Sequence, residues 1–317
     1  MASATTSRCT WPFSLPSSRR ARVAMAMKVE HYLRVQDLPE LREPVLLTAF
    51  SGWNDAARVA TSALLALCRL DGVLRFADIR SEEFFVFTET RPTISLDPAG
   101  QRSVQWPANR FFSYTVPSAD HDVVLLIGTE PQLKWETFCR VILSMAERLG
   151  VSSLITLGGL LADVPHTLTP RLTGFASDRS LVPQLEKLDV SLSSYEGPTG
   201  IVGALHDTWR YTNRPAFSLW GNVPHYISAS PNPQISLALL QRVSGLLGTP
   251  LPVETLESEA KKFRADIDEA VAQNPEALEY VRQLEAQYAS DAAKENTPEL
   301  LSDLEQFLRS RRPKSDE

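Results

Sequence analysis

The chain has 317 residues, which is more than a single hydrophobic core usually holds, so one large domain with an appendage is expected. A hydrophobic fraction of 43% and a charged fraction of 22% are typical of a globular protein, and a net charge of −6 without a clustered basic patch argues against a nucleic-acid partner. The uncharged stretch 215–241 contains four prolines, so it lacks the sustained apolar run of a membrane span.

Residues 1–30 differ from the rest of the chain in composition. They are rich in Ser, Ala and Arg, and the first acidic residue is Glu30. Two interpretations remain open: a disordered tail or a start assigned too early, which we favour, and an organelle transit peptide. Three widely spaced cysteines, Cys9, Cys68 and Cys139, form no CxxC pair, which favours a reducing compartment and a cytoplasmic location.

Folded sequence is expected from residue 31, where short apolar runs predict buried strands. The predicted strands are 44–50, 73–79, 84–87, 92–96, 103–106, 111–116, 122–127, 153–157, 173–177, 190–194 and a run ending at Trp220. Glycines at 158 and 159 are expected to close the strand before them, and the segment 221–226 is expected to be a turn. Helices are predicted at 56–70, 135–149, after the turn 196–200, and at 232–247, where Asn232 is the cap and Gly248 the stop.

This alternation of strands and helices predicts an α/β fold, a three-layer α/β/α sandwich around a mixed, largely parallel sheet, in residues 31–250. The sequence after it differs, because apolar residues recur at helical spacing over 256–271 and again over 278–288. A last helix is predicted after Thr297-Pro298. Residues 251–317 are therefore expected to form a helical extension that packs on the sandwich or binds a partner.

Polar turns follow several predicted strands, at the sheet edge where α/β proteins bind ligands. Their candidate residues are Asn54, Asp55, Glu130, Glu196, Thr199 and His225. If these turns converge, two carboxylates and a histidine could perform acid–base chemistry in one cleft. For each residue alone a structural role is favoured, with Asn54 or Asp55 and Thr199 as helix caps and Glu130 accepting a backbone N–H in a turn.

Motifs of known catalytic and cofactor sites are missing from the sequence. It contains no GxxxxGK[ST], GxGxxG, HExxH or GxSxG, and its five histidines are scattered. The run 196–200 could offer backbone N–H groups to an anion at a helix start, which is a weak signal. His206 is expected to be a surface or capping residue. No cofactor and no metal ion is expected.

Six separated motifs together resemble one known family. They are SGWNDA at 51–56, FVFTETRP at 85–92, IGTEP at 127–131, LGGLLADVPHT at 157–167, YEGPTGIVG at 195–203 and LWGNVPHYI at 219–227. Their order and spacing resemble the bacterial branch of the proteasome assembly chaperone 2 family across about residues 31–290, including the NPEALEYVRQLE segment.

The resemblance implies a phosphorylase-like α/β/α fold, a helical C-terminal extension and self-association, as a trimer in bacterial relatives. It also implies an assembly-chaperone role, because eukaryotic and archaeal members of the family assist assembly of the proteasome α ring. Eukaryotic and archaeal relatives dock on the proteasome through a C-terminal hydrophobic-Tyr-any tripeptide, whereas this sequence ends Ser315-Asp316-Glu317, so docking by that route is not expected.

Two functions are therefore compared. The favoured one is a non-catalytic assembly-chaperone-like or scaffold protein that forms homo-oligomers and binds a protein partner through its C-terminal helices. The alternative is an enzyme or binder for nucleosides or phosphate compounds, acting in the predicted cleft. Neither function requires a nucleic acid or a membrane.

Overall fold

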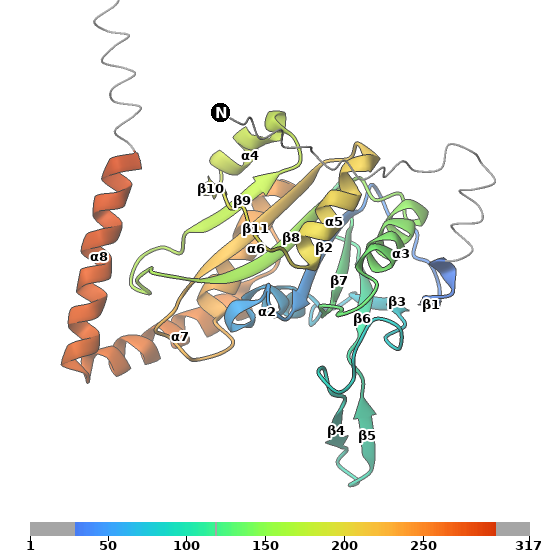
Figure 1. The fold of residues 1–317 in the computed structure, drawn as a ribbon, viewed down its shortest axis with the longest axis horizontal. Coiled ribbons are helices and arrows are strands. Elements are labelled where there is room, and N and C mark those ends of the chain that lie inside the picture. The colour runs from blue at the N-terminus through green and yellow to red at the C-terminus, as the bar shows by residue number, and fades with distance from the viewer. Residues whose placement is uncertain (1–28, 118, 296–317) are drawn as a thin grey trace, which may run out of the picture. The chain divides into compact units, whose positions relative to one another are not determined.

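The computed structural model describes residues 29–117 and 119–295 (Figure 1). The strands are β1 Leu33–Val35, β2 Val45–Ser51, β3 Leu74–Ile79, β4 Thr93–Leu96, β5 Arg102–Gln105, β6 Asn109–Tyr114, β7 Val123–Thr129, β8 Ser153–Ala162, β9 Leu172–Ala176, β10 Val190–Leu192 and β11 Ala216–Pro224. The α-helices are α2 Val59–Leu67, α3 Trp135–Arg148, α4 Val182–Glu186, α5 Ile201–Trp209, α6 Pro233–Leu247, α7 Glu254–Ala272 and α8 Pro275–Glu295. Short 3-10 helices are Ala56–Arg58, Arg179–Leu181 and Arg210–Thr212.

Nine strands form one mixed sheet in the order β1-β3-β6-β7-β2-β8-β11-β9-β10, and β4 and β5 form a separate hairpin. The pairs β1–β3, β3–β6, β6–β7 and β9–β11 are antiparallel, and β9–β10 is parallel. The predicted α/β class with a mixed sheet and C-terminal helices is confirmed. The chain divides into two compact units: unit 1 has residues up to 46, 74–154 and 198–216, and unit 2 has 47–73, 155–197 and those from 217 onward.

Unit 1 contains the antiparallel strands β1, β3, β6 and β7, with α3 and α5 packed on each other. Helix α3 buries the stripe Phe138, Ile142 and Met145, because apolar residues three and four positions apart share one helix face. The buried carboxylate of Asp122 pairs with Arg42 at 2.7 Å. This pair joins the segment before β2 to the start of β7.

The hairpin β4–β5 extends away from the other strands of unit 1 (Figure 1). One of its faces carries a polar network, in which the hydroxyls of Ser95 and Ser103 are 2.7 Å apart. The cross-strand pair Ile94 and Val104 lies on the other face, and both side chains are exposed. Alternation of polar and apolar residues along both strands explains the two faces.

Unit 2 contains β9 and β10, most of β2, β8 and β11, and the helices α2, α4, α6, α7 and α8. Two glycines allow helices to approach its strands. A Cβ atom on Gly159 would lie 2.4 Å from Val59 of α2, and one on Gly221 would lie 2.3 Å from Ile235 of α6. Helices α2 and α6 pack on each other, and α7 packs on α6. These close approaches explain why the strands need glycine there.

Three sequence predictions about these elements were wrong. Residues 84–87 form turns rather than a strand, because Phe84 and Phe85 are both buried and fill the core from a turn. Strand β8 continues through Gly158 and Gly159 to Ala162, since these glycines serve close packing: a Cβ on Gly158 would lie 2.6 Å from the Trp220 ring. Strand β11 likewise continues through 221–224, the start of the predicted turn.

The predicted helix 56–70 begins irregularly and ends early. Ala57 and Arg58 have positive φ of 46° and 54°, which interrupts the helix, so only a short 3-10 segment precedes α2 and α2 starts at Val59. The N-terminal tail up to residue 28 and the helix predicted after Thr297 lie outside the described residues. The predicted boundary between residues 250 and 251 stays a prediction.

Candidate functional site

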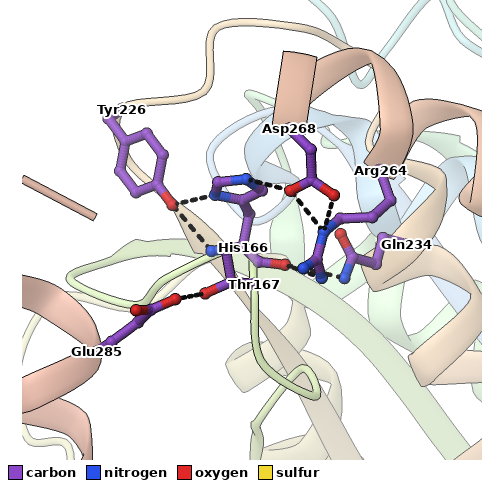
Figure 2. Close-up of polar contacts among 7 residues, drawn as sticks. All are labelled: His166, Thr167, Tyr226, Gln234, Arg264, Asp268 and Glu285. Carbon is purple, nitrogen blue, oxygen red and sulfur yellow. Dashed lines mark hydrogen bonds and ion pairs between the residues drawn. The ribbon is translucent and has the colours of Figure 1, made fainter. Parts of the chain in front are cut away.

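A cluster of polar side chains connects the loop after β8 to the end of β11 and to the C-terminal helices (Figure 2). We call it the His166 cluster. Its members are His166, Thr167, Tyr226, Gln234, Arg264, Asp268 and Glu285. All of them belong to unit 2. At its centre, the residue His166 is 3% exposed.

His166 makes hydrogen bonds on both ring nitrogens. Its Nδ1 lies 2.7 Å from the Tyr226 hydroxyl, and its Nε2 lies 3.1 Å from Asp268 Oδ1. The backbone N–H of His166 also donates to the Tyr226 hydroxyl at 2.8 Å. Because a carboxylate only accepts hydrogen bonds, Nε2 carries the ring proton, and Nδ1 then accepts the proton of the Tyr226 hydroxyl. The order is therefore tyrosine to histidine to aspartate.

Burial and the neighbouring carboxylate shift the pKa of His166 in opposite directions. Burial is the largest influence and lowers the pKa of His166, whereas Asp268 acts to raise it. The net effect is a pKa below the ordinary value, which agrees with a neutral imidazole. Burial also raises the pKa of Tyr226, so its hydroxyl stays protonated. Both groups are therefore neutral near pH 7.

Helix α7 is held to the same loop by Arg264. Its Nε lies 2.9 Å from both carboxylate oxygens of Asp268, one helical turn further on, and its NH1 donates to the His166 carbonyl at 2.8 Å. Gln234, in the first turn of α6, donates to that carbonyl at 3.2 Å. Helix α8 joins through Glu285, whose carboxylate accepts a hydrogen bond from the Thr167 hydroxyl. The loop thus contacts α6, α7 and α8 together.

The order Tyr226, His166, Asp268 resembles the proton relay of a catalytic triad, but the surroundings favour a positioning role. The hollow beside His166 has a volume of about 10 Å³, which is room for about one water molecule. Substrate sites are usually on the order of 300–1,000 Å³. The hollow is too small for a substrate of that size, and the contacts of the cluster join a loop to three helices.

The predicted site residues Asn54 and Asp55 are both buried, at the start of α2. Asp55 Oδ1 accepts the backbone N–H groups of Ala60 at 2.8 Å and Thr61 at 3.3 Å, and its other oxygen accepts the Thr61 hydroxyl. Burial raises the pKa of Asp55, against these hydrogen bonds. The carbonyl of Asn54 accepts the N–H of Gly159 at 2.8 Å. Asp55 therefore has the helix-capping role that the sequence analysis considered for it.

Glu130 and Thr199 lie in unit 1, at the start of α5. Glu130 Oε1 accepts the backbone N–H of Ile201, the first residue of α5, at 2.8 Å. Thr199 lies before the N-cap residue Gly200, and no side chain at the N-cap position accepts from the helix. The helix end predicted to be capped by Thr199 is therefore capped by Glu130, whose carboxylate reaches the positive end of the helix from the residue after β7.

The two remaining candidates, Glu196 and His225, lie exposed in unit 2. His225 Nδ1 is 3.0 Å from Asp163, and its Nε2 is 3.2 Å from the hydroxyl of Tyr280 in α8. The structure therefore brings His225 to the C-terminal helices, beside the His166 cluster. That Asn54, Asp55, Glu130, Glu196, Thr199 and His225 line one cleft stays a prediction.

His206 was predicted to be a surface or capping residue, and this was wrong. It is 9% exposed among the buried residues of α5, and burial lowers its pKa to about 3. Burial also raises the pKa of the Cys139 thiol to about 12, as expected for a core cysteine. Neither residue has the chemistry of a reactive group at neutral pH.

Sequence reasoning missed the His166 cluster, although a signal was present. The tripeptide Val-Pro-His occurs twice, at 164–166 and 223–225, each time at the end of a strand. In the structure the two copies meet, since the N–H of His225 donates to Ala162 and Tyr226 follows the second copy onto His166. No single sequence can show that pairing.

Within residues 29–117 and 119–295, no group of three or more His, Cys, Asp or Glu side chains could hold a metal ion. Over the same part of the chain, no helix combines the length and the apolar character needed to cross a bilayer.

Comparison with known proteins places the chain in a family. The model of the PAC2 family matches residues 49–271, and the chain belongs to that family. The resemblance drawn from the six motifs is thereby confirmed. No curated protein matches the chain.

Solved structures agree with this assignment. A PAC2 family protein from Streptomyces avermitilis is 37% identical, with a TM-score of 0.67 over 75% of this chain and 99% of that one. A proteasome-assembly chaperone homologue from Mycobacterium tuberculosis is 36% identical, with a TM-score of 0.68 and the same coverage. The archaeal proteasome activator PbaB of Pyrococcus furiosus, at 17% identity and a TM-score of 0.61 over 75% and 97%, shares the fold.

Proposed function

We propose that this protein is a non-catalytic, assembly-chaperone-like protein that binds another protein through helices α7 and α8. The single observation that carries the proposal is the His166 cluster, in which polar groups that resemble a catalytic site order the C-terminal helices instead. Membership of the PAC2 family and the likeness to a proteasome-assembly chaperone homologue support it.

The two helices use only part of their surface within the chain. Helix α7 buries Leu256 and Ala260, and α8 buries Val281 and Leu284, as the apolar stripes predict. Most of the other side chains from 254 to 290 are exposed, and this segment has nine acidic and four basic residues. An exposed acidic surface on ordered helices favours a partner with a basic face, through charge complementarity.

The finer parts of the proposal follow from the family resemblance. From that resemblance we expect a homo-oligomer, a cytoplasmic location and a partner among proteasome α subunits. The 36% identical relative, a proteasome-assembly chaperone homologue, supports the choice of partner. The enzyme alternative needs the predicted cleft at the strand ends. Within that set, Asp55 and Glu130 already accept helix N–H groups, which disfavours a role as free acid or base.

The test uses purified proteasome α subunits and the full-length protein. Native mass spectrometry follows complex formation and the rate at which α rings assemble. The variant Asp266→Lys/Glu279→Lys reverses two exposed charges on α7 and α8, and we expect it to weaken the complex at least tenfold. The control Asp71→Lys/Glu89→Lys makes the same change in net charge elsewhere. Equal behaviour of the two variants, or no complex with the unaltered protein, contradicts the proposal.

A further inference from the structure

Unit 1 contains a cleft that the proposed function does not use. Its volume is about 590 Å³, within the range of small-molecule sites. It is formed by β1, β3, the turn after β3 and the residues that follow β5. Four arginines line it: Arg34, Arg75, Arg80 and Arg110. The cleft is far too large for a gap between packed side chains, and its lining is unusually rich in guanidinium groups.

One carboxylate of the lining, Asp78, pairs with these arginines. Asp78 stands opposite Arg34 and Arg110 in the strand registers of β1–β3 and β3–β6, so the three side chains share one face of the sheet. Asp78 pairs with Arg75, and its Oδ1 lies 3.9 Å from Arg110 Nε. Both of these atoms are buried without a hydrogen-bond partner among the described residues. Buried polar groups left unpaired are rare and need an explanation, such as a missing ligand.

The four arginines of the cleft outnumber its three carboxylates, Asp78, Glu82 and Glu83. Neither Arg34 nor Arg80 has a side-chain hydrogen bond or ion pair with any described residue. Glu83 also lines the cleft, but it contacts Lys134 and lies 3.7 Å from His31, so its charge is compensated. Two free guanidinium groups beside a third that is incompletely paired form a site for an anion with several oxygens.

An aromatic pair lines the same cleft. The rings of Phe87 and Trp106 pack edge to face with their centroids 4.8 Å apart, and Trp106 is 52% exposed. An exposed indole beside guanidinium groups offers a stacking surface for a planar ring. Glu82, an exposed carboxylate of the lining, is an acceptor of the type that binds sugar hydroxyls.

We propose that this cleft binds a mononucleotide, with Arg34 and Arg80 on the phosphate and Trp106 against the base. A phosphate monoester carries a charge of roughly −1.5 to −2 at pH 7 and three acceptor oxygens, which suits two unpaired guanidinium groups. The size of the cleft suits one nucleotide rather than a folded partner. This binding site is independent of helices α7 and α8.

The test is isothermal titration of the full-length protein with AMP, GMP, CMP and UMP. Ribose 5-phosphate, adenosine and inorganic phosphate serve as partial ligands. At least one nucleotide is expected to bind at micromolar to low millimolar concentration and to quench Trp106 fluorescence. The exposed variants Arg34→Gln and Arg80→Gln should each weaken it on the order of tenfold, the effect of losing one charge-assisted hydrogen bond. Trp106→Ala should weaken the nucleotide but not ribose 5-phosphate.

The control is Arg69→Gln, an exposed arginine of unit 2 whose loss should leave nucleotide affinity unchanged. Thermal melts establish that each variant is folded. The proposal is overturned if neither titration nor fluorescence detects binding of any nucleotide at about 5 mM. At that concentration even weak specific ligands bind measurably. It is also overturned if Arg34→Gln and Arg80→Gln bind as well as the unaltered protein, or if an acidic octapeptide binds at the cleft and nucleotides do not.

Discussion

His166 and Asp268 lie 102 positions apart in the chain, and their side chains meet at 3.1 Å. This contact joins the loop after β8 to helix α7, and Tyr226 holds the other side of the imidazole. A buried histidine with a tyrosine and a carboxylate is the arrangement of a proton relay, yet here it fixes the position of a helix. Variants at Asp268 and Tyr226 test that role, and variants at Glu130 and Thr199 test the capping of α5.

Removing the carboxylate of Asp268 should loosen the C-terminal helices. In Asp268→Ala, His166 Nε2 and Arg264 both lose an acceptor, and we expect a loss of about 1–3 kcal/mol in the free energy of unfolding. Amide exchange should increase in α7 and α8 more than in β8 or β11. Asp266→Ala, on an exposed position of the same helix, is the control. Equal exchange in the two variants would show that the contact does not order α7.

Removing the hydroxyl of Tyr226 should destabilise the same region. That oxygen accepts the backbone N–H of His166 and donates to its Nδ1, so Tyr226→Phe leaves a partly buried donor without a partner. The expected cost is about 1–3 kcal/mol by urea denaturation. Tyr211→Phe, whose hydroxyl accepts from Arg210 at the surface, should cost less than about 0.5 kcal/mol. A Tyr226→Phe variant as stable as the unaltered protein would argue against the bridging hydroxyl.

The capping of α5 distinguishes Glu130 from Thr199. Glu130→Ala removes the acceptor for the Ile201 N–H, and we expect a loss of about 0.5–2 kcal/mol, typical of a lost cap. Thr199→Ala should cost less than about 0.5 kcal/mol, because Thr199 precedes the cap position. Urea denaturation of both variants gives the comparison. The opposite order of the two losses would favour the cap expected from sequence.

Burial of His206 predicts that stability depends on acid pH. Its pKa is about 3 in the folded protein, against an ordinary value of 6.5, so the unfolded chain binds a proton first as the pH falls. The stability is fully present above pH 6.5 and is lost between pH 6.5 and 3, by roughly 1.4 kcal/mol per pH unit. Denaturation at a series of pH values should show a shallower slope in His206→Gln.

His31→Gln provides the control for that series, because His31 is exposed and near Glu83. It should retain the slope of the unaltered protein between pH 6.5 and 4. Comparing the variants removes the contributions of other groups, including Asp55, whose raised pKa acts in the opposite direction as the pH falls. If His206→Gln keeps the full slope, another group causes the acid sensitivity.

The sequence predicted those elements whose cause is local. Asn232 caps α6 through the N–H groups of residues 234 and 235, and Gly248 ends it at φ 68°, as the Asn-Pro and Gly signals indicated. The apolar stripes of α7 and α8 were likewise predicted from the spacing of apolar residues alone. Such signals depend on a few neighbouring residues.

The incorrect predictions concern residues that contact parts of the chain far away in the sequence. Glycines 158 and 159 looked like a strand end, but they accommodate Trp220 and Val59, which only the folded structure brings near. His206 looked like a flank residue because helical spacing does not show how deeply the fold buries it. The His166 cluster needed polar contacts across 60 to 118 positions, which a single sequence does not encode visibly.

Amide hydrogen exchange of the full-length protein, with and without purified proteasome α subunits, tests the central proposal most directly. The account predicts that adding the subunits slows exchange in α7 and α8, and that Asp266→Lys/Glu279→Lys removes this protection while Asp71→Lys/Glu89→Lys keeps it. Slower exchange confined to other elements, with α7 and α8 unchanged, would contradict it.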